Sequence, residues 1–195
     1  AMASARICTS TKLAASDTTT SLRFFSGARI WKITTVTADT PQRRGDGGVS
    51  LALDKVGWPR IRYYNDTFVD VDYAAVDGKT WRIVTAVSTE IVDTSGTSLA
   101  LDKSGRPRIR YITRGFSPDD PRTLMLASFD GMAWKTEVVA SSQNARGATS
   151  LALDSKGNPR VTYFDAATCD LVNAARAGTA WTAEPVAPAG SNSGG

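Results

Sequence analysis

The sequence predicts an all-β fold built from repeats, and two observations carry this prediction. The first is the segment Ser-Leu-Ala-Leu-Asp, which occurs three times in the 195 residues, at 50–54, 98–102 and 150–154. The second is that each copy continues, after a short turn, into Pro-Arg, a β-branched residue, one further residue and Tyr. A unit of about 50 residues that recurs along a chain is typical of a propeller or a solenoid.

Each complete repeat is predicted to form four short strands. The Ser-Leu-Ala-Leu strand ends in an Asp-x-x-Gly turn, in which Asp caps backbone N–H groups and Gly adopts a positive φ. The second strand begins at Pro, a position where a missing N–H is tolerated. The third and fourth strands flank a tight turn in which Gly precedes Trp by three residues. This turn occurs at Gly78 and Trp81, at Gly131 and Trp134, and at Gly178 and Trp181.

A degenerate unit precedes the three complete ones. Residues 22–25 match a third strand, and the segment that starts at Trp31 matches a fourth strand. We therefore expect a single domain over residues 1–195, with four units at about 4–45, 46–93, 94–146 and 147–190. The first unit lacks its innermost strand, and residues 1–3 have the character of an expression scar. The predicted fold is a β-propeller of four blade units with four antiparallel strands each.

The units resemble the blades of Asp-box propellers, the sialidase-like family. In that family Ser-x-Asp-x-Gly-x-x-Trp forms the hairpin between the third and fourth strands, and the Gly and Trp positions match here. The sequence departs from the box at its Asp position, which holds Val76 and Phe129. Asp-box propellers include glycosidases, lectins and scaffolds, so the resemblance implies a fold and does not choose a function.

Composition excludes several classes of function. The chain has no histidine, which removes Ser-His-Asp and Cys-His catalysis. Two cysteines cannot build a cysteine-rich zinc site, so we expect no metal and no other cofactor. The formal charge of +4 is spread over all units, which argues against a nucleic-acid partner. No apolar run approaches the roughly 18 residues that a membrane span needs. We expect a secreted or periplasmic protein.

The residues that recur in every complete unit are interpreted as structural. Catalytic sites are singular, whereas these residues repeat, so we expect turn formation for the aspartates and packing between blades for the tryptophans. Two of the three glutamates share one strand position and are expected to be exposed. The aspartates are Asp54, Asp102 and Asp154, their expected partners are Arg60, Arg108 and Arg160, and the two glutamates are Glu137 and Glu184.

A ligand site is expected where the repeats differ. Loops between the second and third strands share one face of a propeller with the linkers between units, and we call this the variable face. Aromatic side chains beside Asn, Asp and Arg suit a sugar or a polar peptide. The candidate ligand-binding residues are Tyr64, Asn65, Asp66, Arg114, Phe116, Asp119, Arg122, Phe164 and Asp165.

The sequence thus favours a non-catalytic binding or interaction module that takes a glycan or peptide, with carbohydrate binding through the variable face as its specific form. One alternative is a glycan-active hydrolase or lyase, which the missing histidine and scarce glutamate disfavour. Another is a fragment of a larger propeller that assembles through its open edges. Two hypotheses remain for the seam of the ring: homo-oligomerisation, and a disulfide between Cys8 and Cys169.

Overall fold

The computed structural model describes residue 36 and the ranges 48–65, 68–88, 92–114, 122–140 and 145–187. The chain divides into two compact units, residues 1–38 and 39–195, and nearly all described residues belong to the second. The degenerate repeat predicted at 4–45 lies outside the described residues.

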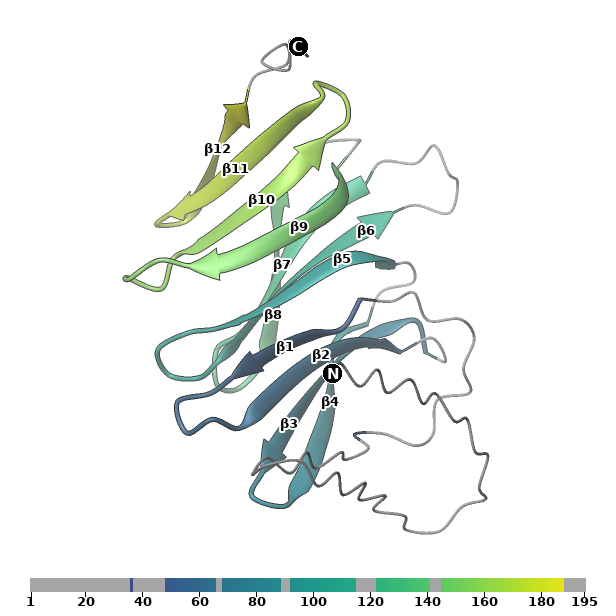
Figure 1. Cartoon of the computed structure of the whole chain (residues 1–195), viewed down its shortest axis with the longest axis vertical. Helices are drawn as coiled ribbons and strands as arrows, with labels where there is room; N and C mark the ends of the chain where they lie inside the picture. Colours follow the sequence, from purple (N-terminus) through teal and green to yellow (C-terminus); the bar gives the residue numbers. More distant parts are fainter. Residues whose placement is uncertain are drawn as a thin grey trace, which may run out of the picture. The chain divides into compact units, whose positions relative to one another are not determined.

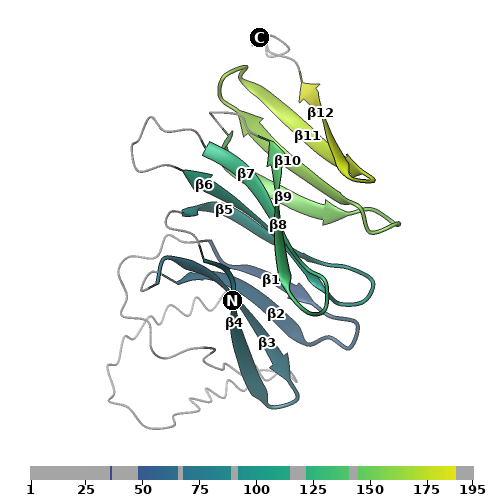
Figure 2. The ribbon, with the colours of Figure 1, turned by 180° about the vertical axis from the view of Figure 1, so that it is seen from behind.

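The described part of the chain forms three four-stranded antiparallel sheets (Figure 1). We call them blade 1 (β1–β4), blade 2 (β5–β8) and blade 3 (β9–β12). Strands follow one another across each sheet in chain order, as the prediction of four-stranded units of about 50 residues requires, and blade 2 lies between the other two (Figure 2). The strands are β1 (Ser50–Leu53), β2 (Pro59–Asn65), β3 (Asp70–Asp77), β4 (Thr80–Ser88), β5 (Val92–Leu101), β6 (Pro107–Arg114), β7 (Arg122–Phe129), β8 (Trp134–Ala140), β9 (Ala145–Leu153), β10 (Pro159–Asp165), β11 (Asp170–Ala177) and β12 (Ala180–Ala187).

Two inner strands are longer than predicted. Strands β5 and β9 begin well before Ser98 and Ser150, because part of each linker joins the sheet. Each extension contains an irregularity in strand pairing, between Asp93 and Ser98 in β5 and between Arg146 and Ser150 in β9. A bulge of this kind adds unpaired residues and bends the strand. The bend allows one strand to begin in the linker from the preceding blade and to continue in the sheet of the next.

The turn after each inner strand is built as predicted. Oδ1 of Asp54 accepts hydrogen bonds from the N–H groups of Val56 (3.0 Å) and Trp58 (2.8 Å), and Gly57 takes a φ of 83°. Oδ2 of the same Asp lies 2.7 Å from an Arg60 nitrogen. Partial burial acts to raise the pKa of Asp54, but these N–H donors and Arg60 together lower it.

The other two turns repeat the arrangement with different partners. Asp102 lies 2.9 Å from Nε of Arg106 and 3.7 Å from Nη2 of Arg108. Asp154 accepts from both the backbone and the side chain of Asn158, and these two bonds lower its pKa. The expectation that the aspartates form the turns is confirmed, and so is the pairing with Arg60 and Arg108, while Arg106 and Asn158 are additional partners.

The core lies between neighbouring blades. One cluster joins blades 1 and 2, and a second joins blades 2 and 3. Trp134 packs against the first, with its ring centroid 5.8 Å from that of Tyr73 in an edge-to-face contact, and Trp181 packs against the second. Packing between blades is therefore confirmed for these two tryptophans. Trp81 is half-buried and belongs to neither cluster.

The inner strands are also linked by hydrogen bonds. The Leu99 N–H donates to Ser50 Oγ at 3.0 Å, and the Leu151 N–H donates to Ser98 Oγ at 3.2 Å. The repeated Ser-Leu pair thus ties each blade to the next. We call each such contact a rung.

Positive charge is buried beside the first rung. The Arg62 and Arg110 side chains are both fully buried, and Arg62 donates through Nη1 to the Gly48 carbonyl. Burial and the neighbouring Arg110 lower the pKa of Arg62 to about 9. Removing a guanidinium from water is costly, so burial of these side chains depends on acceptors such as the Gly48 carbonyl.

One cysteine of the hypothesised disulfide, Cys169, lies within the described residues. Cys169 is an exposed free thiol in the loop between β10 and β11. Cys8 lies outside the described residues, so the Cys8–Cys169 bridge stays a prediction.

Candidate binding grooves between the blades

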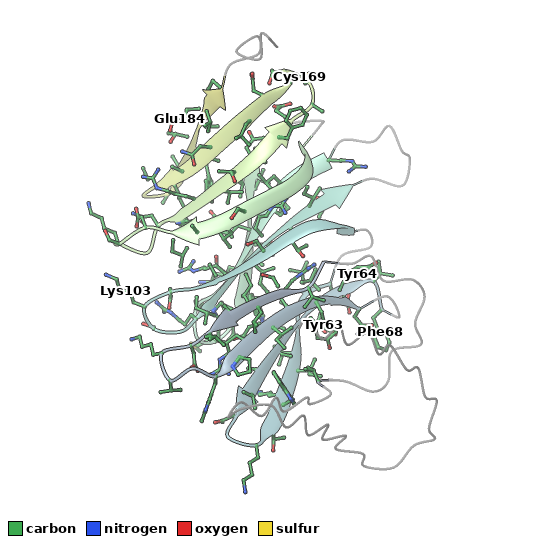
Figure 3. All side chains as sticks on the ribbon, viewed as in Figure 1. Tyr63, Tyr64, Phe68, Lys103, Cys169 and Glu184 are labelled. Atoms are coloured by element: carbon green, nitrogen blue, oxygen red, sulfur yellow. The ribbon has the colours of Figure 1, made fainter. Side chains whose placement is uncertain are left out.

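The variable face lies at the ends of the second strands. Tyr64 and Asn65 end β2, Phe164 and Asp165 end β10, and Arg122 begins β7 beside Arg114, its partner in the strand register. Figure 3 shows Tyr64 and Phe68 at this end of the molecule and Lys103 at the opposite end. Asp66, Phe116, Asp119 and the Arg114 side chain lie outside the described residues.

Two of the predicted residues have bonds within their own blade. Asn65 donates to Oδ2 of Asp72 at 2.8 Å, and the buried Asp72 also accepts from Thr85 Oγ1 at 3.0 Å. Burial, together with the charge and hydrogen bond of Asp72, raises the pKa of Tyr63 to about 12. Asp165 accepts from the Ala167 N–H and forms a turn. Asn65 and Asp165 therefore order their loops.

The opposite end holds a hollow of about 390 Å³ at the three Asp-x-x-Gly turns. Its carboxylates are those of Asp54, Asp102 and Asp154, which the turn N–H groups already occupy. Among the described residues, no group of three or more His, Cys, Asp or Glu side chains is placed to hold a metal ion. This hollow is a consequence of the repeated turns.

A groove with aromatic walls lies between blades 1 and 2. It has a volume of about 390 Å³, and we call it the aromatic groove. Trp134 stands between Tyr73 and Phe129, with centroid distances of 5.8 Å and 5.4 Å. Val84 and Arg82 complete the wall on the side of blade 1. Such a surface can stack on the C–H face of a sugar ring or another flat apolar group.

A second groove, of about 240 Å³, lies in the equivalent place between blades 2 and 3, and its walls are polar. We call it the arginine groove. Arg176 of blade 3 contacts Glu137 of blade 2, with Nη1 and Oε1 3.0 Å apart. Lys135 forms an ion pair with Asp130 at 2.8 Å, and its hydrogen bond is the main cause that lowers the pKa of Asp130 far below its usual range. The lining residues are Arg106, Arg108, Ser128, Phe129, Asp130, Lys135, Thr136, Glu137 and Arg176.

Three buried polar atoms of the arginine groove have no hydrogen-bond partner within the described residues. They are Nε of Arg108, Nε of Arg176 and Oγ of Ser128. A buried donor without a partner costs about 1–3 kcal/mol. Such atoms in a native protein normally meet water or a ligand. These atoms are covered by neighbouring side chains, so what the groove presents on its surface is the ion pair of Arg176 and Glu137.

The two grooves differ in charge at two equivalent positions. Where the arginine groove has Glu137 and Arg176, the aromatic groove has Val84 and Phe129. The expectation that Glu137 is exposed is wrong, because its side chain packs against Arg176, whereas that expectation is confirmed for Glu184. The signal that was missed is Arg176, a charged residue at a position that holds Val or Phe in the other repeats.

No family model matches the chain, and no curated protein matches it in sequence. Among solved structures, a fucose lectin from Kordia zhangzhouensis in complex with methyl-fucoside aligns over 70% of this chain and 97% of its own, with 19% identity and a TM-score of 0.47. AofleA from Arthrobotrys oligospora aligns over 71% of this chain with 11% identity and a TM-score of 0.49, and the chain spans 41% of its length. At these TM-scores neither similarity indicates what this chain binds.

Proposed function

We propose that this chain is a non-catalytic carbohydrate-binding module, and that the arginine groove is its principal binding site. The observation that carries the proposal is the charged lining of the groove, in which the ion pair of Arg176 and Glu137 lies beside Arg108 and Lys135. Ligand pockets commonly measure about 300–1,000 Å³. A groove of 240 Å³ is suited to one small polar ring.

The chemistry of the groove fits adjacent hydroxyl groups. A guanidinium presents planar N–H donors, and a carboxylate accepts two or more hydrogen bonds, so Arg176 and Glu137 can together bind a pair of sugar hydroxyls as donor and acceptor. The existing ion pair fixes both side chains before the ligand arrives, which lowers the entropic cost of binding. The aromatic groove supplies the complementary stacking surface around Trp134.

The carboxylates of the arginine groove argue against glycoside hydrolysis. That reaction needs a carboxylic acid with a raised pKa opposite a second carboxylate. In this groove the pKa of Asp130 is lowered by Lys135, and Glu137 is held by Arg176. Neither group is placed to deliver a proton, so binding without turnover is the expected behaviour.

A glycan array with the whole chain, followed by titration calorimetry on the glycans that bind, tests the proposal. Arg176→Leu and Glu137→Gln should each weaken binding roughly tenfold or more, since each removes a charged hydrogen-bond partner worth about 1.5–3 kcal/mol. Glu184→Gln is the matched control, because Glu184 is the exposed equivalent of Glu137 in blade 3 and pairs with Asn173 instead of an arginine. Circular dichroism checks that all three variants remain folded.

The same titrations separate the arginine groove from the variable face. Phe164→Ala combined with Asp165→Asn should leave the affinity unchanged. Loss of binding in that double variant, with Arg176→Leu unaffected, would place the ligand on the variable face instead. Chromatography of the bound glycan after long incubation should recover it intact, and cleavage products would favour the hydrolase or lyase alternative.

A further inference from the structure

The inner strand of each blade has two different sides. In blade 2, Leu99 points toward blade 1 and is buried, while Ala100 packs against the cluster shared with blade 3. The other inner strands follow the same rule. Leu151 of blade 3 packs back toward blade 2, and Ala52 of blade 1 packs forward toward blade 2. At each interface, the leucines of one inner strand therefore cover the Ser and Ala of the inner strand that precedes it in the chain. One rung, the hydrogen bond from a Leu N–H to a Ser Oγ, joins the two strands.

Blade 1 presents the leucine half of such an interface with no blade described against it. Leu51 is 60% exposed, whereas its equivalents Leu99 and Leu151 are each 6% exposed. Leu53, two residues further along the same side, is 62% exposed. The N–H of Leu51 is equivalent to the N–H groups of Leu99 and Leu151, which donate in the two rungs. We call this side of β1 the leucine edge.

Blade 3 presents the opposite half. Ser150 and Ala152 are exposed, although their equivalents in blades 1 and 2 are partly buried. Leu171 is 44% exposed, whereas Val71 and Leu124 at the same position are fully buried. The equivalent exposure extends to Phe164 and Val186, and we call the side of blade 3 with Ser150, Ala152, Phe164, Leu171 and Val186 the serine edge.

We propose that the serine edge of one copy binds the leucine edge of a second copy, head to tail. The contact repeats the interface that the chain already builds twice: the Leu51 N–H of one copy donates to Ser150 Oγ of the other, and Leu51 and Leu53 cover Ala152. The two edges are different surfaces, so the contact is heterologous and each copy keeps one edge for a further partner. Burial of the apolar side chains of both edges drives the association.

The fit is specific because each edge lacks what the other supplies. The described residues contain three Ser-Leu-Ala-Leu strands and two rungs, which leaves one acceptor at Ser150 and one donor at Leu51. Two leucine edges would place large side chains against each other and provide no hydroxyl acceptor. Two serine edges would provide no leucine to cover Ala152. A second copy in head-to-tail orientation satisfies both.

Light scattering coupled to size exclusion, from low to high micromolar protein, tests the proposal with two edge variants. Leu51→Arg blocks the leucine edge and Ala152→Arg blocks the serine edge, and each side chain is exposed, so neither change disturbs the fold of its own chain. Wild type should show the mass of an assembly, and each variant alone the mass of one copy, with the dissociation constant raised more than about tenfold. Met132→Arg, at an exposed apolar residue of the middle blade, should retain the wild-type mass.

Mixing the two variants distinguishes a head-to-tail contact from any symmetric one. Leu51→Arg retains its serine edge and Ala152→Arg retains its leucine edge, so an equimolar mixture should form particles of two copies and nothing larger. Monomeric wild type at the highest concentration would overturn the proposal, as would edge variants that keep the wild-type mass. A wild-type monomer whose Tm falls on Leu51→Arg would also overturn it, because residues 1–47 of the same chain would then cover the leucine edge.

Discussion

Cys169 and Val69 adopt the left-handed backbone conformation that favours glycine. Their φ angles are 58° and 61°, and each residue immediately precedes a third strand, at Asp170 and Asp70. For a residue with a β-carbon this conformation costs roughly 1–2 kcal/mol. Because two repeats use it at the same position, the geometry of the loop is fixed by the blade, and the side chain is tolerated at a cost.

Replacement of Cys169 by Gly should therefore stabilise the protein by about 0.5–1 kcal/mol, since relief of the strained φ exceeds the flexibility that Gly adds to the unfolded chain. The Cys169 side chain is exposed, so little packing is lost. Urea unfolding measures the effect. Ala167→Gly, an exposed neighbour without a positive φ, should be neutral or destabilising. A Cys169→Gly variant less stable than Ala167→Gly would show that the loop is not strained.

At the scale of the strand, local sequence determined much of the architecture. The Ser-Leu-Ala-Leu segments, the Pro at the start of each second strand and the Asp-x-x-Gly turns all act within a few residues, and the strands lie where these signals predict them. The contact between Glu137 and Arg176 could not be found in the same way. It joins strands of different blades, so it depends on how the sheets pack against each other.

The hydrogen bond of Asn65 was not predicted, for a related reason. A polar residue at the end of a strand is compatible with a ligand site, and its true partner, Asp72, is set by strand pairing. The sequence did contain a signal, because Asp72 occupies a strand position that holds Met125 and Val172 in the other repeats. A buried carboxylate at an otherwise apolar position requires donors nearby, and Asn65 and Thr85 supply them.

The tryptophans allow a prediction about the interfaces between blades. Trp134→Ala should lower the free energy of unfolding by about 3 kcal/mol, the lower end of the range for large-to-small changes in a core, because Trp134 fills the space between Tyr73 and Phe129. Trp181→Ala should cost a similar amount. Trp81, which belongs to neither cluster, should cost least. Equal losses at all three positions in chemical denaturation would contradict this ranking.

At the scale of the whole molecule, stability depends on turns and interface contacts that recur in each described blade. Each described blade contributes one Asp turn and packs mainly against its neighbours, as in other repeat proteins, so the free energies of the units and interfaces add along the chain. The three turns respond to pH in the same direction. The pKa of each of Asp54, Asp102 and Asp154 is lowered in the folded protein.

Acid should therefore weaken all three described blades together. A carboxyl whose pKa is lower in the folded state binds more protons when unfolded, so its contribution is fully present above the unfolded value, about 3.9 for Asp, and is lost as the pH falls below it. The urea midpoint should be steady from pH 7 to about pH 5 and fall between pH 4 and pH 2. Asp102→Asn should make that fall shallower, because one of the three carboxylates no longer titrates while the amide oxygen can still accept the turn N–H bonds.

The exposed Asp77, which accepts none of the described turn bonds, provides the control, and Asp77→Asn should reproduce the wild-type profile. A profile for Asp102→Asn as steep as that of wild type would mean that the turns do not govern the acid sensitivity of the fold.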